Sequence, residues 1–229
     1  MRMLTTGAAA GLALLLAGVA TAALAPKTMM FNLTTVTDAR GMHVNVPAKV
    51  WVKGQKARVE ANEPMAGPTI RLVNGSRMHT LYPQQKRGMV TTLQTGPKGP
   101  KNPMEFIIAN VGQLTRNARK TGQQTIDGYP CDVYRLKRNE EGGTMTMRAW
   151  ITRATQPRLP LKVEQVLEVR RPNMSVNQSQ TTRITGLKIG VPIPDSVFAL
   201  PPGYKIVEGG PGGAGLPGGP GMGVPGMRH

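Results

Sequence analysis

Apolar and polar residues alternate along most of the chain, with the period of two that is typical of β-strands with one buried face. In residues 44–53, valines and one alanine occupy every second position. Gly54 and Gln55 permit a tight turn, and the alternation resumes in residues 56–61, which predicts a β-hairpin. The same reasoning predicts further strands at 29–37, 70–73, 77–82, 89–94, 129–137, 144–152, 161–169 and 174–184.

Residues 102–122 form the one segment with a helical period. Asn102 suits the N-cap, Pro103 the first helical position and Glu105 the capping box, while Gly122 would end the helix. The apolar residues of this segment, mostly spaced for one helical face, are Met104, Phe106, Ile107, Ile108, Val111, Leu114 and Ala118. The pattern therefore predicts one amphipathic helix among many strands.

The predicted fold class is α+β, mainly antiparallel β, with a curved open half-barrel sheet of about 9–10 strands wrapped around this helix. Such a sheet is roughly 45 Å wide, whereas a helix with its side chains is about 10–12 Å wide. One helix cannot cover the apolar face. Either loops fill the remaining space as an ordinary core, or an apolar ligand occupies it, and the pattern alone leaves both open.

The two ends of the chain differ from the body. Residues 1–25 carry an early Arg2, an apolar run and the ending Ala23-Leu24-Ala25, which predict a secretory signal peptide. Residues 209–229 are rich in Gly and Pro without a hydrophobic pattern, which predicts a disordered tail. We therefore expect one domain over residues 26–208, exported to the periplasm or secreted, and soluble after cleavage.

The chain is strongly basic, with a formal net charge of +17, or +16 once Arg2 leaves with the signal peptide. Such a surface attracts polyanions. Export favours anionic lipid head groups or envelope polymers over nucleic acid, and a solvated basic surface without a specific partner is the alternative. Cys131 is the single cysteine, so no intramolecular disulfide can form.

The sequence offers little catalytic chemistry. His43, His79 and His229 lack metal-ligand spacing, so no metal or cofactor is expected. Cys131 lies within a predicted strand without an evident histidine partner and is interpreted as a core thiol. The carboxylates at positions 60, 164 and 168 lie on predicted charged strand faces, where pairing with basic neighbours is favoured over an acid–base dyad. We expect a protein that is not an enzyme.

Four segments, in the same order along the chain, resemble the superfamily of outer-membrane lipoprotein carrier and lipoprotein-sorting proteins. They are the hairpin Trp51 to Glu60, the strand Asp127 to Leu136, the segment Pro160 to Glu164 and the ending Ile193 to Tyr204. The resemblance covers most of the body. It implies a half-barrel of antiparallel sheet whose concave apolar face holds acyl chains or another lipid.

These observations together predict a monomeric carrier or binding protein of the cell envelope, with a lipid or lipidated protein as partner and no nucleic acid. The alternative is a non-enzymatic sensor or protein-interaction module on the same fold. The residues expected to line an apolar ligand cavity are Val50, Val52, Val59, Ile70, Leu72, Phe106, Ile107, Val111, Leu114, Met145, Met147, Ile151, Leu161 and Val163.

Overall fold

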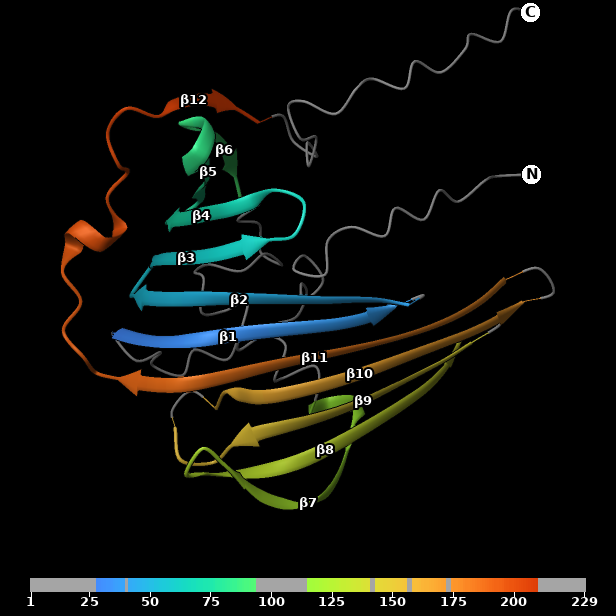
Figure 1. Cartoon of the computed structure of the whole chain (residues 1–229). Helices are drawn as coiled ribbons and strands as arrows, with labels where there is room; N and C mark the ends of the chain where they lie inside the picture. Colours follow the sequence, from blue (N-terminus) through green and yellow to red (C-terminus); the bar gives the residue numbers. More distant parts are fainter. Residues whose placement is uncertain are drawn as a thin grey trace, which may run out of the picture.

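The chain forms one sheet of twelve strands in the computed structural model, which describes residues 28–39, 41–93, 115–140, 143–155, 158–171 and 174–209 (Figure 1). The strands are β1 (Thr28–Ala39), β2 (Met42–Lys53), β3 (Lys56–Glu63), β4 (Gly67–Asn74), β5 (Arg77–Tyr82), β6 (Arg87–Thr92), β7 (Arg119–Ile126), β8 (Tyr129–Glu140), β9 (Gly143–Thr152), β10 (Pro160–Arg171), β11 (Met174–Ile189) and β12 (Lys205–Glu208). Two short 3-10 helices are also present, η1 (Pro83–Gln85) and η2 (Asp195–Phe198).

The sheet has the strand order β12-β6-β5-β4-β3-β2-β1-β11-β10-β9-β8-β7, so β12 and β7 form its two edges. All neighbouring strands run antiparallel except β12, which pairs with β6 in parallel. The sheet is curved and open (Figure 1). The prediction of a mainly antiparallel curved sheet is therefore confirmed, with two strands more than the sequence pattern indicated.

The predicted helix at 102–122 is not confirmed. Residues 115–117 form a single helical turn, and β7 begins at Arg119, so the expected helical end at residues 119–122 is wrong. Residues 102–114, with Phe106, Ile107, Val111 and Leu114 of the expected cavity, lie outside the described residues. Arg119 and Lys120, which the prediction placed in the last turn of the helix, belong instead to an edge strand.

Tight turns of left-handed backbone connect the hairpins. Gly54 between β2 and β3 has a φ of 56°, and Gly75 between β4 and β5 has a φ of 58°. Between β7 and β8, Asp127 and Gly128 both have positive φ, at 47° and 81°. Two successive positive φ values are the mark of a type I′ turn, for which Asp-Gly is a preferred sequence.

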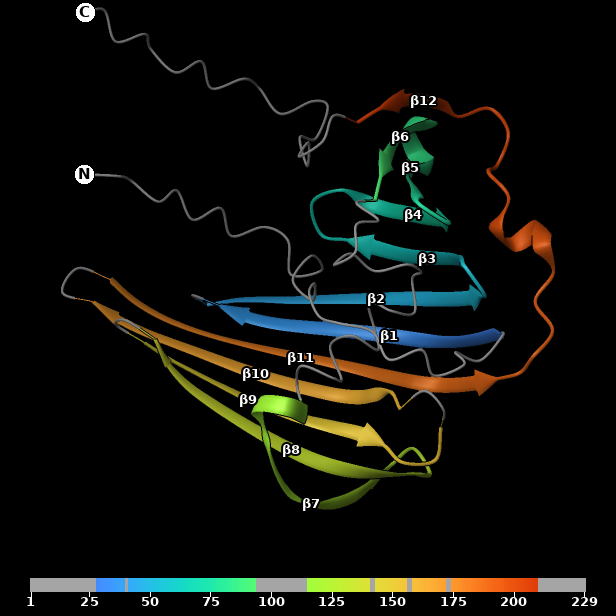
Figure 2. The ribbon, with the colours of Figure 1, turned by 180° about the vertical axis from the view of Figure 1, so that it is seen from behind.

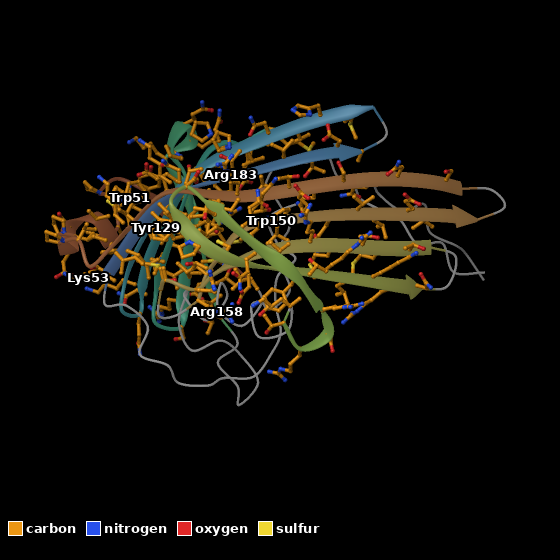
Figure 3. The ribbon with its side chains drawn as sticks, turned by 90° about the horizontal axis from the view of Figure 1, so that it is seen from below. Trp51, Lys53, Tyr129, Trp150, Arg158 and Arg183 are labelled. Carbon is orange, nitrogen blue, oxygen red and sulfur yellow. The ribbon has the colours of Figure 1, made fainter. Side chains whose placement is uncertain are left out.

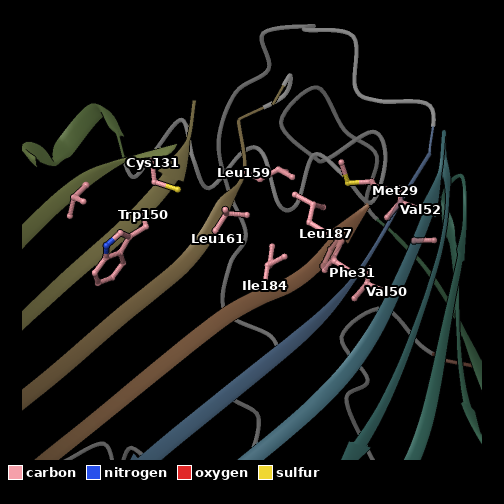
Figure 4. Packing of buried hydrophobic residues seen from close by; sticks show 12 residues of the cluster. Met29, Phe31, Val50, Val52, Cys131, Trp150, Leu159, Leu161, Ile184 and Leu187 are labelled. Atoms are coloured by element: carbon pink, nitrogen blue, oxygen red, sulfur yellow. The ribbon is translucent and has the colours of Figure 1, made fainter. Parts of the chain in front are cut away.

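The largest buried cluster lies on one face of β1–β3 and continues to β8–β11 (Figure 4). Register places Met29 opposite Val52 and Phe31 opposite Val50, while Val50 faces Val59. We call the side of the sheet that carries Phe31 and Val50 the apolar face. The cluster consists of Met29, Phe31, Val50, Val52, Ala57, Cys131, Val133, Trp150, Leu159, Leu161, Ile184 and Leu187.

A second cluster extends the apolar face toward the β7 edge, on the opposite side of β9 from Trp150 of the first cluster. Thr182 faces Val163, Val163 faces Ala149, and Ala149 faces Tyr134. Met147 and Ile151 belong to the same cluster, with Leu136 packed against it. The alternation read from the sequence therefore marks the core on both halves of the sheet.

The segment after β11 runs past the ends of the strands to reach the far edge, where it adds β12 (Figure 2). On the way η2 packs beside β3 and β4, and Arg58 donates a hydrogen bond to the carbonyl of Val197 at 2.9 Å. Asp195 forms ion pairs with Lys53 and Lys56. Ile193 and Phe198 are buried. The segment Ile193 to Tyr204, which resembles the carrier superfamily, thus connects the end of β11 to β12 at the edge of the sheet.

Candidate functional site

Two β-bulges flank the β10–β11 pair. One interrupts the pairing of β11 with β1, and the other interrupts the pairing of β10 with β9. Met30 faces Lys188 and Asn32 faces Thr185, so Gly186 and Leu187 together stand opposite Phe31. Gly186 has a φ of 60°, a backbone conformation that an L side chain would strain. Bulges bend a strand and increase its twist, and they often lie beside functional sites.

The second bulge lies at the start of β10. Pro160 faces Ile151 and Lys162 faces Trp150, which makes Leu161 the extra residue. Leu161 and Leu187 are both buried, and both lie at positions where a bulge interrupts the regular hydrogen-bond ladder.

The β7–β8 hairpin reaches back to β11 at the same corner. The hydroxyl of Tyr129 donates a hydrogen bond to the carbonyl of Leu187 at 3.1 Å. Arg183 binds the carboxylate of Asp127 at 2.7 Å. Figure 3 shows Tyr129, Trp150 and Arg183 gathered where this hairpin lies in front of the other strands. The coiled sheet thus closes one corner with a hydrogen bond and an ion pair.

A pocket of about 310 Å³ lies at this corner, and we call it the bulge pocket. Its apolar wall consists of Leu161, Ile184 and Leu187. Asp127 and Tyr129 supply a carboxylate and a hydroxyl, and the lining is completed by Thr185 and Gly186. The site therefore combines an apolar wall with a small number of polar groups, as ligand pockets commonly do.

An ionic cluster around Asp132 holds Arg158, which lies three residues before Leu161. Asp132 is buried on β8, and Lys120 on β7 and Arg158 in the loop each lie 2.7 Å from one of its carboxylate oxygens. Arg158 also donates to the carbonyl of Thr152 at 3.2 Å. Burial acts to raise the pKa of Asp132, but Lys120 and Arg158 hold it below its usual value. The ionic cluster thus holds Arg158 in place, and its neighbour Leu159 is fully buried.

Cys131, next to Asp132, is free and buried in the largest cluster. Burial is the main cause that raises the pKa of its thiol. Its Sγ donates a weak hydrogen bond to the carbonyl of Tyr129 at 3.4 Å. The interpretation of Cys131 as a core thiol is therefore confirmed as far as its burial is concerned.

The structure separates the expected cavity residues into groups. Val50, Val52, Val59 and Leu161 belong to the largest cluster or pack against it, and Met147, Ile151 and Val163 belong to the second. Met145 is half-buried and faces Leu167 on the same side of the sheet.

Ile70 and Leu72 do not join these residues. They face Glu60 and Arg58, which lie on the opposite side of β3 from Val59. Leu72 is buried there, on the side where η2 packs. Of all the expected residues, Leu161 alone among those described lines the bulge pocket.

The other lining residues were missed because they are brought together by the bulge and the folded-back hairpin. Two local signals were available in the sequence. Gly186 interrupts an otherwise regular strand pattern, which is a common mark of a bulge. Asp127-Gly128 between two strands is a strong hairpin signal. Neither signal says that the turn contacts β11.

The remaining candidate groups have ordinary partners. His43 is exposed and lies 2.6 Å from Asp38, and His79 on β5 faces Leu72 and Val90, while His229 lies outside the described residues. Glu60 pairs with Arg58 and Glu164 pairs with Lys162, in each case two residues along the same strand.

Two kinds of feature are absent from the described part of the chain. It contains no group of three or more His, Cys, Asp or Glu residues placed to hold a metal ion. It also contains no helix with the length and apolar character needed to cross a bilayer.

No protein-family model matches the chain, and no curated protein matches it significantly. Solved structures with a similar course of the chain include an uncharacterized conserved protein from Thermus thermophilus, which is 8% identical over 80% of this chain and 91% of that chain, with a TM-score of 0.45. MucB in its complex with MucA from Pseudomonas aeruginosa is 14% identical over 78% of this chain and 58% of that chain, with a TM-score of 0.43.

A third structure is a domain from Vibrio parahaemolyticus described as an outer membrane lipoprotein-sorting protein, which is 12% identical over 75% of this chain and 88% of that chain, with a TM-score of 0.32. None of these likenesses assigns a ligand or a functional residue to this chain.

Proposed function

We propose that this protein is an exported envelope protein that binds the end of an acyl chain, carried by a lipid or a lipidated protein, in the bulge pocket. The observation that carries the proposal is the lining of that pocket, with Leu161, Ile184 and Leu187 on one side and Asp127 and Tyr129 on the other. An apolar wall beside a polar group suits an amphiphile, whose chain and head group need different surroundings.

The size of the pocket favours part of a lipid over a whole one. Its volume of about 310 Å³ is at the lower end of the range for small-molecule sites. Because one water molecule occupies about 30 Å³ in the liquid, the pocket has room for about ten groups of that size. This is enough for the end of a hydrocarbon chain.

The polar side of the pocket supplies a place for the head group. Arg183 is 48% exposed and is bound to Asp127, which lines the pocket. An anionic head group could compete with Asp127 for the guanidinium of Arg183, since both offer oxygen acceptors to the same donors. The orientation would then be chain inward and head group at Arg183.

The rest of a longer chain would follow the apolar face away from the pocket. Val163 lies two residues beyond Leu161 on β10 and joins the second cluster with Met147 and Ile151. Met145 is half-buried beyond them. Methionine is flexible and polarizable and suits a lining that adapts to chains of different shape.

The test is to fill the pocket with a side chain. Thr185→Trp places an indole among the lining residues, and Thr181→Trp is the matched control because Thr181 is a half-buried threonine on the same strand outside the pocket. The full chain is delipidated and titrated with dansylated undecanoic acid, with fluorescence as readout. We expect binding by the parent and by Thr181→Trp, and a loss of affinity of about tenfold or more, or about 1.4 kcal/mol, in Thr185→Trp.

Absence of binding by the folded parent would refute the proposal and favour the sensor or protein-interaction alternative. Equal binding by Thr185→Trp and the parent would place the ligand elsewhere. Thermal melts of both variants identify any loss that comes from unfolding.

A further inference from the structure

Three arginines from three neighbouring strands stand directly opposite one another at the β7 edge of the sheet. Arg119 on β7 faces Arg135 on β8, and Arg135 faces Arg148 on β9. All three side chains are exposed. We call them the arginine row. Directly opposed side chains have their Cβ atoms about 4.5–5.5 Å apart, so the row places three positive charges close together.

Like charges in directly opposed positions destabilise a sheet, and the usual compensation is missing here. Among the described residues, no carboxylate forms an ion pair with Arg119, Arg135 or Arg148. The next residue of the row is Glu164, and its carboxylate is held by Lys162 at 2.6 Å. Lys137, two residues beyond Arg135 on the same face of β8, is exposed and adds a fourth charge.

One arginine of the row, Arg148, packs against an aromatic ring of the sheet. The guanidinium of Arg148 lies 4.6 Å from the ring centre of Trp150, over its face. Trp150 is itself buried, and its indole nitrogen donates to Gln124 at 2.7 Å. A cation over an indole face is favourable. One member of the row is therefore positioned by the protein rather than by an acidic partner.

We propose that the arginine row, with Lys137, is a docking surface for the anionic head groups of a lipid bilayer. The charge of the row is the complement of such a surface, and arginine binds phosphate oxygens through two parallel hydrogen bonds. A membrane is favoured over nucleic acid because residues 1–25 predict export from the cytosol. The proposal does not depend on what the bulge pocket binds.

Each basic side chain near an anionic membrane surface contributes about 1 kcal/mol, or about fivefold in affinity. Removing three of them should therefore weaken binding about a hundredfold. The interaction should also weaken as salt is raised, because exposed charges are screened.

The experiment is co-sedimentation of the full chain with vesicles of phosphatidylglycerol and phosphatidylcholine in equal parts, and with phosphatidylcholine alone. The test variant combines Arg119→Gln, Arg135→Gln and Arg148→Gln. The control combines Arg77→Gln, Arg87→Gln and Lys205→Gln, which removes the same charge from exposed positions near the other edge of the sheet.

We expect binding to the anionic vesicles only, a loss of about a hundredfold in the test variant and a loss of less than about fivefold in the control. The melting temperature of the test variant should equal or exceed that of the parent, because like-charge repulsion is relieved. Equal losses in the two variants would mean that net charge alone acts, and would overturn the proposal. Failure to bind anionic vesicles, or tighter binding of a DNA duplex to the same row, would overturn it as well.

Discussion

At the scale of single residues, the alternating pattern locates the core but not the pocket. Val50, Val52 and Leu161 were expected on an apolar face, and all three are buried. Burial of every second residue follows from strand geometry, so it can be read from the sequence. Ile184 and Leu187 look like ordinary core residues in the sequence. Their place in a pocket depends on a bulge and on the β7–β8 hairpin, whose Tyr129 lies 58 residues before Leu187 in the chain.

Asp132 is the residue with the clearest expected effect on stability against pH. Its folded-state pKa is lowered, so its contribution to stability is complete above its unfolded-state pKa of about 3.9 and is lost as pH falls through the lower folded-state value. Asp132→Asn should remove this dependence. It should also cost about 1–2 kcal/mol at pH 7, less than for a fully buried pair because Lys120 and Arg158 are 46% and 35% exposed.

Thermal melts of the parent and Asp132→Asn between pH 7 and about pH 2.5 check this expectation. The stability difference between the two proteins should shrink as the pH falls. A difference that stays constant over the whole range would show that Asp132 does not act through its charge.

At the scale of elements, the sequence pattern located ten strands and missed two, each for a physical reason. Residues 119–125 of β7 are all exposed, so this strand carries no alternation that a pattern could reveal. Residues 119–122 were therefore assigned to the end of the predicted helix. β12 has only four residues, and it becomes a strand because the preceding segment brings it to the free edge of β6.

Packing between β12 and its neighbours can be tested at Gly88. A Cβ atom at this position would lie 2.6 Å from Leu81 Cδ2 and 2.7 Å from Ile206 Cδ1. Gly88→Ala should therefore cost about 1–3 kcal/mol through overpacking. Gly122→Ala on β7 is the matched control, because a Cβ there meets nothing within 4 Å.

Denaturant unfolding of both glycine variants measures the difference. The control should be as stable as the parent or slightly more stable, since alanine restricts the unfolded chain. Equal stability of Gly88→Ala and Gly122→Ala would show that Ile206 does not pack against β6 and β5 as described.

At the scale of the whole molecule, we propose that the folded domain ends near Gly209. The N–H of Gly209 donates to the carbonyl of Val90 at 2.8 Å, so β12 is held through its last contact with β6. Removal of residues 210–229 should leave the melting temperature unchanged within about 2 °C, because the tail sequence lacks apolar groups that could offset ordering entropy.

Removal of residues 193–229 should instead lower the melting temperature by on the order of 10 °C or more, because the burial of Ile193 and Phe198 is lost. Differential scanning calorimetry of the two truncated chains makes the comparison. If the longer deletion melted at the same temperature as the parent, the segment that carries η2 and β12 would be dispensable for the fold.

The mainly antiparallel sheet could be predicted from the sequence because alternation and short connections specify it, whereas the helix that it was expected to wrap around is not confirmed. The return of the β7–β8 hairpin to β11 could not be predicted from the sequence. It depends on the contact of Asp127 with Arg183 and on that of Tyr129 with Leu187. The bulge pocket is a product of these contacts. Its use as a lipid site is therefore a question for direct measurement.

The most direct measurement is methyl NMR of the delipidated full chain with a bound fatty acid, recording nuclear Overhauser effects between the acyl chain and protein methyl groups. Our account predicts contacts from the end of the acyl chain to the methyl groups of Leu161, Ile184 and Leu187. Leu72 and Leu81 are buried leucines elsewhere in the sheet and serve as internal controls without contacts. Acyl contacts to Leu72 and Leu81, with none to the three pocket residues, would contradict the account.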